Sequence, residues 1–335
     1  MFLDFNRKEN IAKGLLFRNN EQKSLFEYAQ KIRDEVFSKQ VEVRSVIEYS
    51  NICGQACNYC GMNRFSKLKR YILSDDELLK HIDKLYSIGR RVIMIQTGEF
   101  HSDVYFNRLY ELLRNIKNKY TDLSLVCSFG CLSEHKYKKL RDIGIERYLL
   151  KFETSNSKLY KKAKPSSSLK NKLAHIKILK KYGFMVSSGN ITGLPGQTPD
   201  SLINDLLLLK KLDIPMGSTS VFIPNDMSIY ANYPPGDIHT TLNFMAILRI
   251  MCPFMLIPTT SSLELVIKDG QYLGLMAGAN VVTLHDGTPG KDENNFIIYK
   301  KDRYKPKDDL LKTVARANLI ASSIIPQGYS FSSKN

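Results

Sequence analysis

Three cysteines of the chain have a spacing that suits one iron-sulfur cluster. Cys53, Cys57 and Cys60 form a C-x3-C-x2-C pattern, with Tyr59 directly before the third cysteine. Cysteine thiolates are the usual protein ligands of a 4Fe-4S cluster. Three ligands leave one iron without a protein ligand, and an open coordination position distinguishes a catalytic metal site from a closed structural one. The pattern therefore predicts one reactive 4Fe-4S cluster.

Two other interpretations of these cysteines have less support. A structural zinc site needs four ligands, and the first histidine of the chain, His81, is distant from the cysteines in sequence. A disulfide framework is typical of short secreted chains. This chain has 335 residues, six cysteines and no apolar signal-peptide segment at its start. We therefore expect a reducing, cytoplasmic location, and the lack of any run of about 20 apolar residues predicts no membrane-spanning helix.

The chain carries a formal net charge of +16, which raises the question of nucleic acid. Lysine is frequent in residues 135–141, 158–164 and 170–181, and such stretches can bind phosphates. We expect these lysines to face water on helices, because the whole chain is rich in lysine and no nucleic-acid motif accompanies them. A basic rim around the cluster would instead attract an acidic flavodoxin or ferredoxin as the electron donor.

Strands and helices alternate along the chain in the order that predicts a parallel sheet. Residues 1–40 have the pattern of a helical cap. Three predicted helices end at a glycine just before the next strand, at Gly89, Gly144 and Gly183. We therefore predict a (β/α)8 TIM-like barrel over residues 41–300, with a C-terminal helix and tail over 301–335. The predicted strands are 41–49, 91–96, 123–127, 147–152, 184–188, 219–223, 255–258 and 279–284.

Two carboxylates lie where such a barrel has its active site, at the C-terminal ends of strands. Glu99 closes the sequence Thr97-Gly98-Glu99 after the second predicted strand, and Glu153 ends the fourth. A carboxylate accepts hydrogen bonds from ammonium or hydroxyl groups. An ordinary solvated strand end is the alternative for both residues, but their position beside the cysteine loop favours a binding site.

With these residues placed, the chain resembles the biotin synthase branch of radical S-adenosylmethionine (SAM) enzymes. Within that branch it is most similar to the HydE maturases of iron-only hydrogenase. The resemblance implies that the free iron binds SAM, and that an electron from the cluster cleaves SAM to methionine and a 5′-deoxyadenosyl radical. It spans residues from about 28 to 300. Besides the three cysteines it rests on Arg33-Asp-Glu-Val-Phe37, Val43-Arg-Ser-Val-Ile-Glu-Tyr-Ser-Asn51, Gln96-Thr-Gly-Glu99, Glu153-Thr154, Gly193-Leu-Pro-Gly-Gln-Thr198, Ile257-Pro-Thr-Thr260 and Ala277-Gly-Ala-Asn-Val-Val282.

The resemblance implies a SAM site with a role for each matching position. Glu153 would bind the ribose hydroxyls. Lys151 and Lys172 stand where the family places arginines near Glu153 and the SAM carboxylate. A lysine lacks the two-pronged geometry with which arginine binds a carboxylate. The remaining implied cofactor contacts are Thr97, Gly98 and Glu99 to the SAM amino group, the backbone near Tyr59 to adenine, and Ile191 beside the adenosyl group.

Three glycines follow the fifth predicted strand. Gly189, Gly193 and Gly196 do not have the spacing of a dinucleotide-binding loop. We interpret them as turn glycines that let the backbone approach the adenosyl group. On the substrate side the resemblance implies an anion site at Thr259 and Thr260, with two ordinary β-branched strand residues as the alternative.

Cys127 falls at the end of the third predicted strand, where a biotin synthase holds part of its sulfur-donating second cluster. The matching position before Ser188 is Ser187, and no cysteine lies in strand 91–96. We therefore expect one cluster and no sulfur insertion. Cys127 is kept as a candidate for the substrate pocket, and the alternative is a small buried residue.

These observations predict a radical SAM enzyme that applies a 5′-deoxyadenosyl radical to a small-molecule or metal-complex substrate. Hydrogen abstraction with rearrangement and adenosyl addition to sulfur both stay open. A methylornithine-synthase-like mutase is the alternative within the class, although the Phe-Ser-Thr and Cys-Tyr-Tyr context of that family is not seen around the cysteines. An iron-sulfur nucleic-acid-binding or sensor protein is the alternative from another class. It would explain the charge and the cysteines, but not Glu99 or Glu153.

Overall fold

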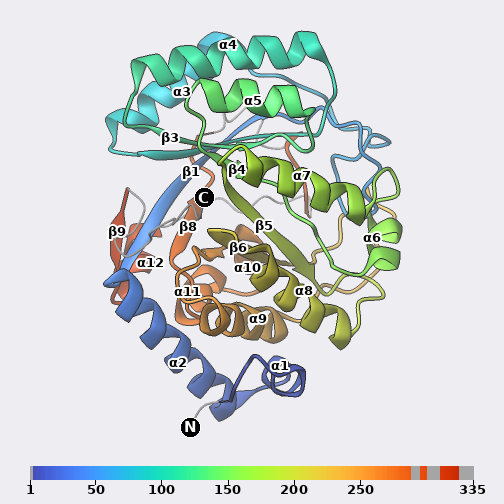
Figure 1. The fold of residues 1–335 in the computed structure, drawn as a ribbon, viewed down its shortest axis with the longest axis vertical. Coiled ribbons are helices and arrows are strands. Elements are labelled where there is room, and N and C mark those ends of the chain that lie inside the picture. Colours follow the sequence, from blue (N-terminus) through green and yellow to red (C-terminus); the bar gives the residue numbers. More distant parts are fainter. Residues whose placement is uncertain (1–2, 288–294, 300–309, 324–335) are drawn as a thin grey trace.

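Eight parallel strands curve into a nearly closed barrel that is surrounded by helices (Figure 1). The structure is a computed structural model that describes residues 3–287, 295–299 and 310–323. The strand order is β6-β5-β4-β3-β2-β1-β8-β7. The predicted TIM-like barrel is therefore confirmed. The strands are β1 Gln40–Ser50, β2 Val92–Thr97, β3 Ser124–Ser128, β4 Arg147–Leu149, β5 Met185–Thr192, β6 Met216–Val221, β7 Pro258–Thr259, β8 Val281–Leu284 and β9 Ile320–Ser322.

The barrel closes where β6 meets the segment that leads into β7. Met216 and Leu256 form an isolated parallel bridge there, and the Gly217 amide donates to the Leu256 carbonyl at 3.0 Å. The last strand, β9, pairs with the start of β1 outside the eight-strand path. Only a helix and a tail were predicted for the C-terminal segment, so β9 was missed.

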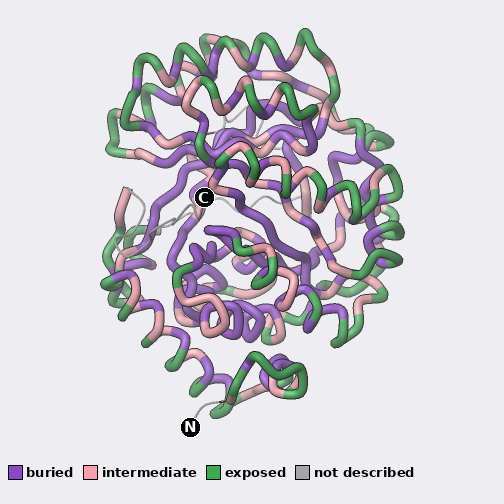
Figure 2. The backbone as a smooth tube through the Cα atoms, viewed as in Figure 1, coloured by how far each residue is buried: buried purple, intermediate pink, exposed green. Residues whose placement is uncertain are grey.

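Helices cover the outside of the barrel, and their apolar faces meet the outward faces of the strands. Side chains along a strand alternate between the two faces, which here separates a barrel interior from a helix-facing core. Val46, Met94 and Val126 form one buried cluster, whereas Ile47 and Ile95 belong to the main core with the helices. The eight barrel strands are largely buried and the outer helix faces are exposed (Figure 2). The helices are α1 Lys8–Leu15, α2 Asn19–Phe37, α3 Asp75–Ser87, α4 Asp103–Lys119, α5 Glu134–Asp142, α6 Ser157–Ala163, α7 Leu169–Lys181, α8 Pro199–Leu212, α9 Ile238–Met251, α10 Ser261–Val266, α11 Gly270–Met276 and α12 Leu310–Arg316.

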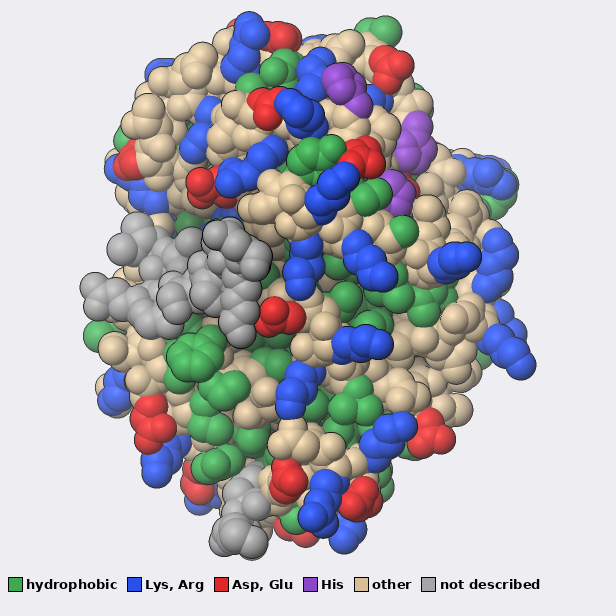
Figure 3. Space-filling view, in the orientation of Figure 1, with side chains coloured by type: hydrophobic (Ala, Val, Ile, Leu, Met, Phe, Trp, Pro, Cys, Tyr) green, Lys and Arg blue, Asp and Glu red, His purple; other side chains and the backbone are tan. Residues whose placement is uncertain are grey.

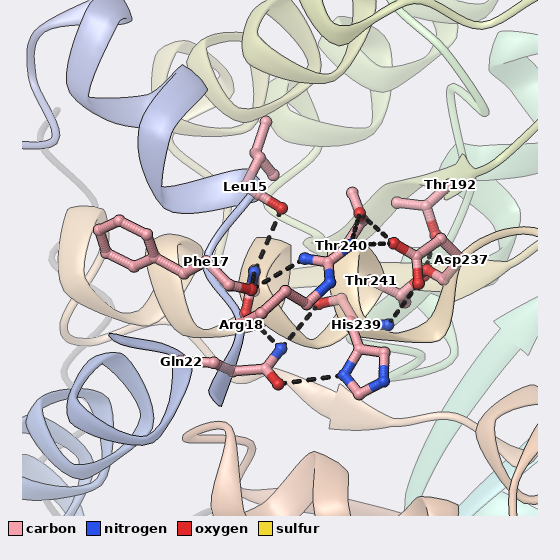
Figure 4. A network of polar contacts seen from close by, with 10 residues as sticks. Leu15, Phe17, Arg18, Gln22, Thr192, Asp237, His239, Thr240 and Thr241 are labelled. Carbon is pink, nitrogen blue, oxygen red and sulfur yellow. Dashed lines mark hydrogen bonds and ion pairs between the residues drawn. The ribbon is translucent and has the colours of Figure 1, made fainter. Parts of the chain in front are cut away.

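The N-terminal cap consists of α1 and α2, and it is fastened to α9 by polar contacts (Figure 4). The Gln22 amide donates to the side-chain oxygen of Asn243 at 2.7 Å, and both side chains are buried. Arg18 forms an ion pair with Asp237, which also caps α9 by accepting from the His239 amide. The cap therefore packs along α9, with α1 also against α8 and α2 also against α11.

Local signals in the sequence explain most of the helix boundaries. Ser74 and Glu77 form the predicted capping box at the start of α3. The three glycines predicted to end helices, Gly89, Gly144 and Gly183, all have positive φ angles. The prediction for Gly189 was wrong, because Gly189 lies inside β5. A Cβ atom there would meet the Ser218 carbonyl oxygen at 1.9 Å, so this glycine allows β5 and β6 to approach rather than forming a turn.

Candidate active site

The cysteine loop leaves β1 at the C-terminal end of the barrel. Cys57 is buried, and Cys53 and Cys60 are half-buried. The loop is fixed from outside by the end of α6 and the segment after it: the Asn58 amide donates to the Ala163 carbonyl at 2.8 Å, and the Ala56 amide donates to Ser166 Oγ at 3.0 Å. The three thiols are thus presented on a loop that is held by the far side of the barrel mouth.

A cavity of about 290 Å³ opens at this end of the barrel, and the three thiols line it. Most of the other residues that the sequence analysis assigned to the site also line it, although they come from five different strands, the loops after them and helix α7. These residues are Tyr59, Thr97, Gly98, Glu99, Lys151, Glu153, Lys172, Ile191 and Thr260. One side of the cavity is apolar, because Tyr59 packs against a buried cluster that contains Ile191 and Leu194.

Glu99 lies at the centre of a buried charged group. Its Oε2 atom is 3.4 Å from Lys164 Nζ and 3.7 Å from Lys172 Nζ, and its Oε1 atom accepts from the Gln55 amide at 3.2 Å. Burial alone would raise the pKa of Glu99, but the two lysines lower it below its usual value. Glu99 is therefore a carboxylate at neutral pH, and the group can bind a zwitterion through both of its charges.

Lys164 was not among the site residues that the sequence analysis proposed. It belongs to the lysine-rich stretch 158–164, which was expected to face water, and that expectation was wrong for Lys164 and Lys172. Both side chains are buried. The cause is the geometry of α6, which ends at Ala163 and turns its next residue toward Glu99. Composition gives no signal for this, since Lys161 and Lys162 on the same helix are exposed.

Glu153 has a strained backbone and an unsatisfied carboxylate oxygen. Its φ angle is 63°, in the left-handed region that non-glycine residues rarely adopt and that is often found at functional sites. The Glu153 amide donates to the Gly189 carbonyl and its own carbonyl accepts from the Ile191 amide, which fix this conformation. Its Oε2 atom is buried and accepts no hydrogen bond from the described residues, with Lys151 Nζ 3.5 Å away. A buried, unsatisfied oxygen at the cavity wall can accept from a ligand hydroxyl.

Asp205 supports the backbone that follows Glu153. It is fully buried and accepts from the Ser155 amide at 2.6 Å and from the Asn190 side-chain amide at 2.9 Å. Burial raises the pKa of Asp205 to about 6, because these neutral donors offset only part of the cost of burying its charge. Asp205 thus links β5, α8 and the Glu153 turn without reaching the cavity.

Two residues proposed for the substrate side lie away from the cavity. Cys127 is fully buried and packs in the core between the sheet and the helices. Thr259 is also fully buried, and its hydroxyl donates to the Gln271 carbonyl at 3.1 Å. The prediction that they contact substrate is therefore corrected, because both point to the helix side of the barrel. Their neighbour Thr260 does line the cavity.

The donor set suits an iron-sulfur cluster better than a single metal ion. Among the residues that the structure describes, no three His, Cys, Asp or Glu side chains converge as ligands of one ion would. A cluster instead accepts each thiolate on a different iron, and the three thiols line the same cavity as Glu99. Burial raises the pKa of the Cys57 thiol to about 11, so a bound cation would be needed to keep it as a thiolate.

Comparison with known proteins agrees with this site. The family model of the Radical SAM superfamily matches residues 47–209. The chain is 34% identical over 279 residues to the FeFe-hydrogenase maturase subunit HydE of Thermotoga maritima, an alignment that covers 82% of this chain and 78% of that protein. The chain belongs to the radical SAM superfamily. As a member of this superfamily it is an enzyme, and the family uses a 4Fe-4S cluster and SAM.

Other radical SAM relatives show how widely this fold is shared. The chain is 28% identical over 329 residues to the 3-methylornithine synthase of Methanosarcina acetivorans, covering 96% of this chain and 92% of that one. A crystal structure of methylornithine synthase superposes with a TM-score of 0.83 at 26% identity, covering 93% of this chain and 92% of that chain. Biotin synthases are also among its relatives. These comparisons support the expected branch of the superfamily. In the described part of the chain, no helix has the length and apolar character to cross a bilayer.

Proposed function

We propose that this radical SAM enzyme binds one 4Fe-4S cluster through Cys53, Cys57 and Cys60, and binds SAM against Glu99 and Glu153. When bound, the cluster supplies the electron that splits SAM into methionine and a 5′-deoxyadenosyl radical. The observation that carries the proposal is the single cavity lined by all three thiols and by both carboxylates. Such an arrangement would bring the open iron and the two ends of SAM into contact.

The charged residues of the cavity have complementary tasks in this proposal. Glu99 would accept from the SAM amino group, while Lys164 and Lys172 would pair with the SAM carboxylate. Glu153 would accept from ribose hydroxyls through its unsatisfied oxygen. The apolar wall of Tyr59 and Ile191 would contact adenine. Enclosure by the barrel strengthens each of these contacts, because few water molecules compete inside it.

The deeper part of the cavity is the proposed substrate site. It is lined by thioether, hydroxyl and basic side chains, a mixture that suits a small polar or anionic substrate. We favour HydE-like chemistry on a small molecule or metal complex, since HydE has the highest identity among the relatives described above. The alternative, formation of 3-methylornithine, is supported by the coverage of that relative and by its structural similarity. The deeper lining residues are Arg44, Met94, Ser128, Met216, Ser218, Thr283 and His285.

An acidic electron-transfer protein of the flavodoxin or ferredoxin type is the proposed reductant. Lysine and arginine side chains gather over α6 and α7 in Figure 3, and Lys161 and Lys162 are exposed next to the residues that hold the cysteine loop. Arg64, Lys67 and Lys69 are exposed on the other side of that loop. Positive potential of this kind speeds the encounter with an acidic partner and weakens with added salt. Nucleic acid is not a proposed partner.

The test is anaerobic reconstitution followed by reduction with dithionite in the presence of SAM. We expect about four irons per chain and release of 5′-deoxyadenosine, with both lost in a variant that replaces the three cysteines by alanine. About eight irons per chain, with about four retained in that variant, would reveal a second cluster. Bound cluster without any SAM cleavage would contradict the proposed reaction. Mass spectrometry for 3-methylornithine in reactions supplied with the common amino acids separates the two candidate chemistries.

A further inference from the structure

The group around Glu99 contains one more positive charge than negative. Lys164 and Lys172 supply two charges and Glu99 supplies one, which leaves a balance of +1 within the ion pairs. Among the residues that the structure describes, the other basic side chain within 4 Å of the Glu99 carboxylate is His101, which cannot supply a negative charge. Lysine is almost never as buried as Lys164 unless it is paired, and its residue is only 7% exposed. A buried surplus cation is costly unless an anion approaches it.

The position of Lys164 points to one such anion, the cluster that Cys57 would help to bind. Asn58 follows Cys57 directly, and it donates to the carbonyls of Lys162 and Ala163 at 2.7 Å and 2.8 Å, the first through its side chain and the second through its amide. The backbone just before Lys164 is therefore tied to the residue that follows the central cysteine. Both Lys164 and Cys57 line the same cavity.

The two lysines are not equivalent in this respect. Lys172 Nζ lies 3.1 Å from Cys131 Sγ, on the side of Glu99 formed by the loop after β3. Lys164 Nζ lies 3.4 Å from Glu99 Oε2, and the two carbonyls just before Lys164 accept from Asn58, the residue after Cys57. Lys164 is thus the cation on the cysteine side of the group.

We propose that Lys164 raises the reduction potential of the cluster that Cys57 helps to bind. This inference rests on the proposed function. Reduction adds one electron to the cluster, taken from an external one-electron donor, and makes and breaks no covalent bond. The added negative charge is stabilised by a fixed cation in a poorly hydrated site. The cysteine loop itself offers no cation between its first two ligands, where the sequence is Gly54-Gln55-Ala56, so the end of α6 supplies it.

The experiment is a redox titration of the reconstituted protein without SAM, followed by the electron paramagnetic resonance signal of the reduced cluster. Lys164→Gln should have a midpoint potential more negative than wild type, and Lys164→Arg should stay close to wild type. Lys162→Gln is the matched control. Its side chain is exposed two residues away on the same segment, so solvent screens its charge and the potential should not change.

Glu99→Gln gives a second measurement of opposite sign. It removes the carboxylate charge that pairs with Lys164, so the midpoint potential should become less negative. This variant keeps the inference testable if Lys164→Gln cannot hold a cluster. Equal potentials in wild type, Lys164→Gln and Glu99→Gln at equal iron content would overturn the inference. If wild-type protein still cleaves SAM, the proposed function stands and only the role of Lys164 fails.

Discussion

Two buried groups of ions in this barrel carry the same set of charges and have very different geometry. At the mouth, Glu99 lies between Lys164 and Lys172 at 3.4 Å and 3.7 Å. Deep inside, Glu42 accepts two hydrogen bonds from Arg147 at 2.9 Å and 3.0 Å, with Arg44 at 3.6 Å. Each group is one carboxylate between two cations, but only the inner one contains a bidentate pair.

The difference separates a structural group from a binding group. The planar guanidinium of arginine matches both oxygens of a carboxylate, so both oxygens of Glu42 accept a hydrogen bond from Arg147 inside the barrel. The lysine ammonium groups at the mouth are point charges on flexible side chains. Their longer distances from Glu99 leave room for a ligand to pair with one of these charged groups. Of the inner group only Arg44 lines the cavity and the tight pair of Glu42 and Arg147 does not, whereas Glu99 and both lysines do. A loose pair of ions in a cavity wall is thus a better sign of function than a tight pair.

Replacing Arg147 should give the largest effect on stability. Arg147→Met leaves the carboxylate of Glu42 buried with only the distant Arg44, and breaking a buried pair typically costs about 3 to 5 kcal/mol of unfolding free energy. Lys172→Met should cost much less, since Glu99 keeps Lys164 and Gln55. Urea unfolding followed by circular dichroism measures both, which suits a chain without tryptophan. Equal losses in the two variants would remove the distinction drawn between the groups.

A double variant sharpens this test. Replacing both partners of a buried ion pair by apolar residues is often neutral or stabilising, because no charge is left unpaired. Glu42→Leu combined with Arg147→Met should therefore recover much of the stability that Arg147→Met loses. Persistent loss in the double variant would indicate that Arg44 also depends on Glu42.

Much of the site could be predicted from the sequence, because its residues sit at strand ends that a parallel barrel brings together. The three cysteines, Glu99 and Glu153 are of this kind. Other positions depend on which face of a strand or turn a residue occupies, and short elements do not reveal that. β7 has only two residues, so no alternation could show that Thr260, and not Thr259, faces the cavity.

Glu153 should have the next largest effect, on SAM binding rather than on stability. Glu153→Ala removes a charge-assisted acceptor worth about 1.5 to 3 kcal/mol, which lowers affinity roughly tenfold or more. Calorimetric titration of the reconstituted, unreduced protein with SAM measures this. Glu146→Ala is the matched control, since Glu146 is exposed just before β4. Unchanged affinity in Glu153→Ala would exclude this carboxylate from the SAM site.

The strained backbone at Glu153 allows a further comparison. Glycine adopts a positive φ angle without the cost that alanine bears, so Glu153→Gly should be more stable than Glu153→Ala by roughly 1 kcal/mol. Both variants should lose the same affinity for SAM. This result would show that the backbone conformation affects the free energy of unfolding and that the carboxylate affects SAM affinity. The strain would then be maintained because it places the carboxylate.

Cys127 should give the smallest effect, and it tests whether the helix-facing core is as inert as its packing indicates. The thiol is fully buried among apolar side chains, and burial raises its pKa, so it is neither a nucleophile nor a ready metal ligand. Cys127→Ala should cost roughly 1 kcal/mol of unfolding free energy through the small cavity that it leaves. Iron content and SAM cleavage should stay at wild-type values. Loss of about half the iron would instead mean that a second cluster uses this residue, and normal iron with failed substrate turnover would mean that Cys127 reaches the substrate after all.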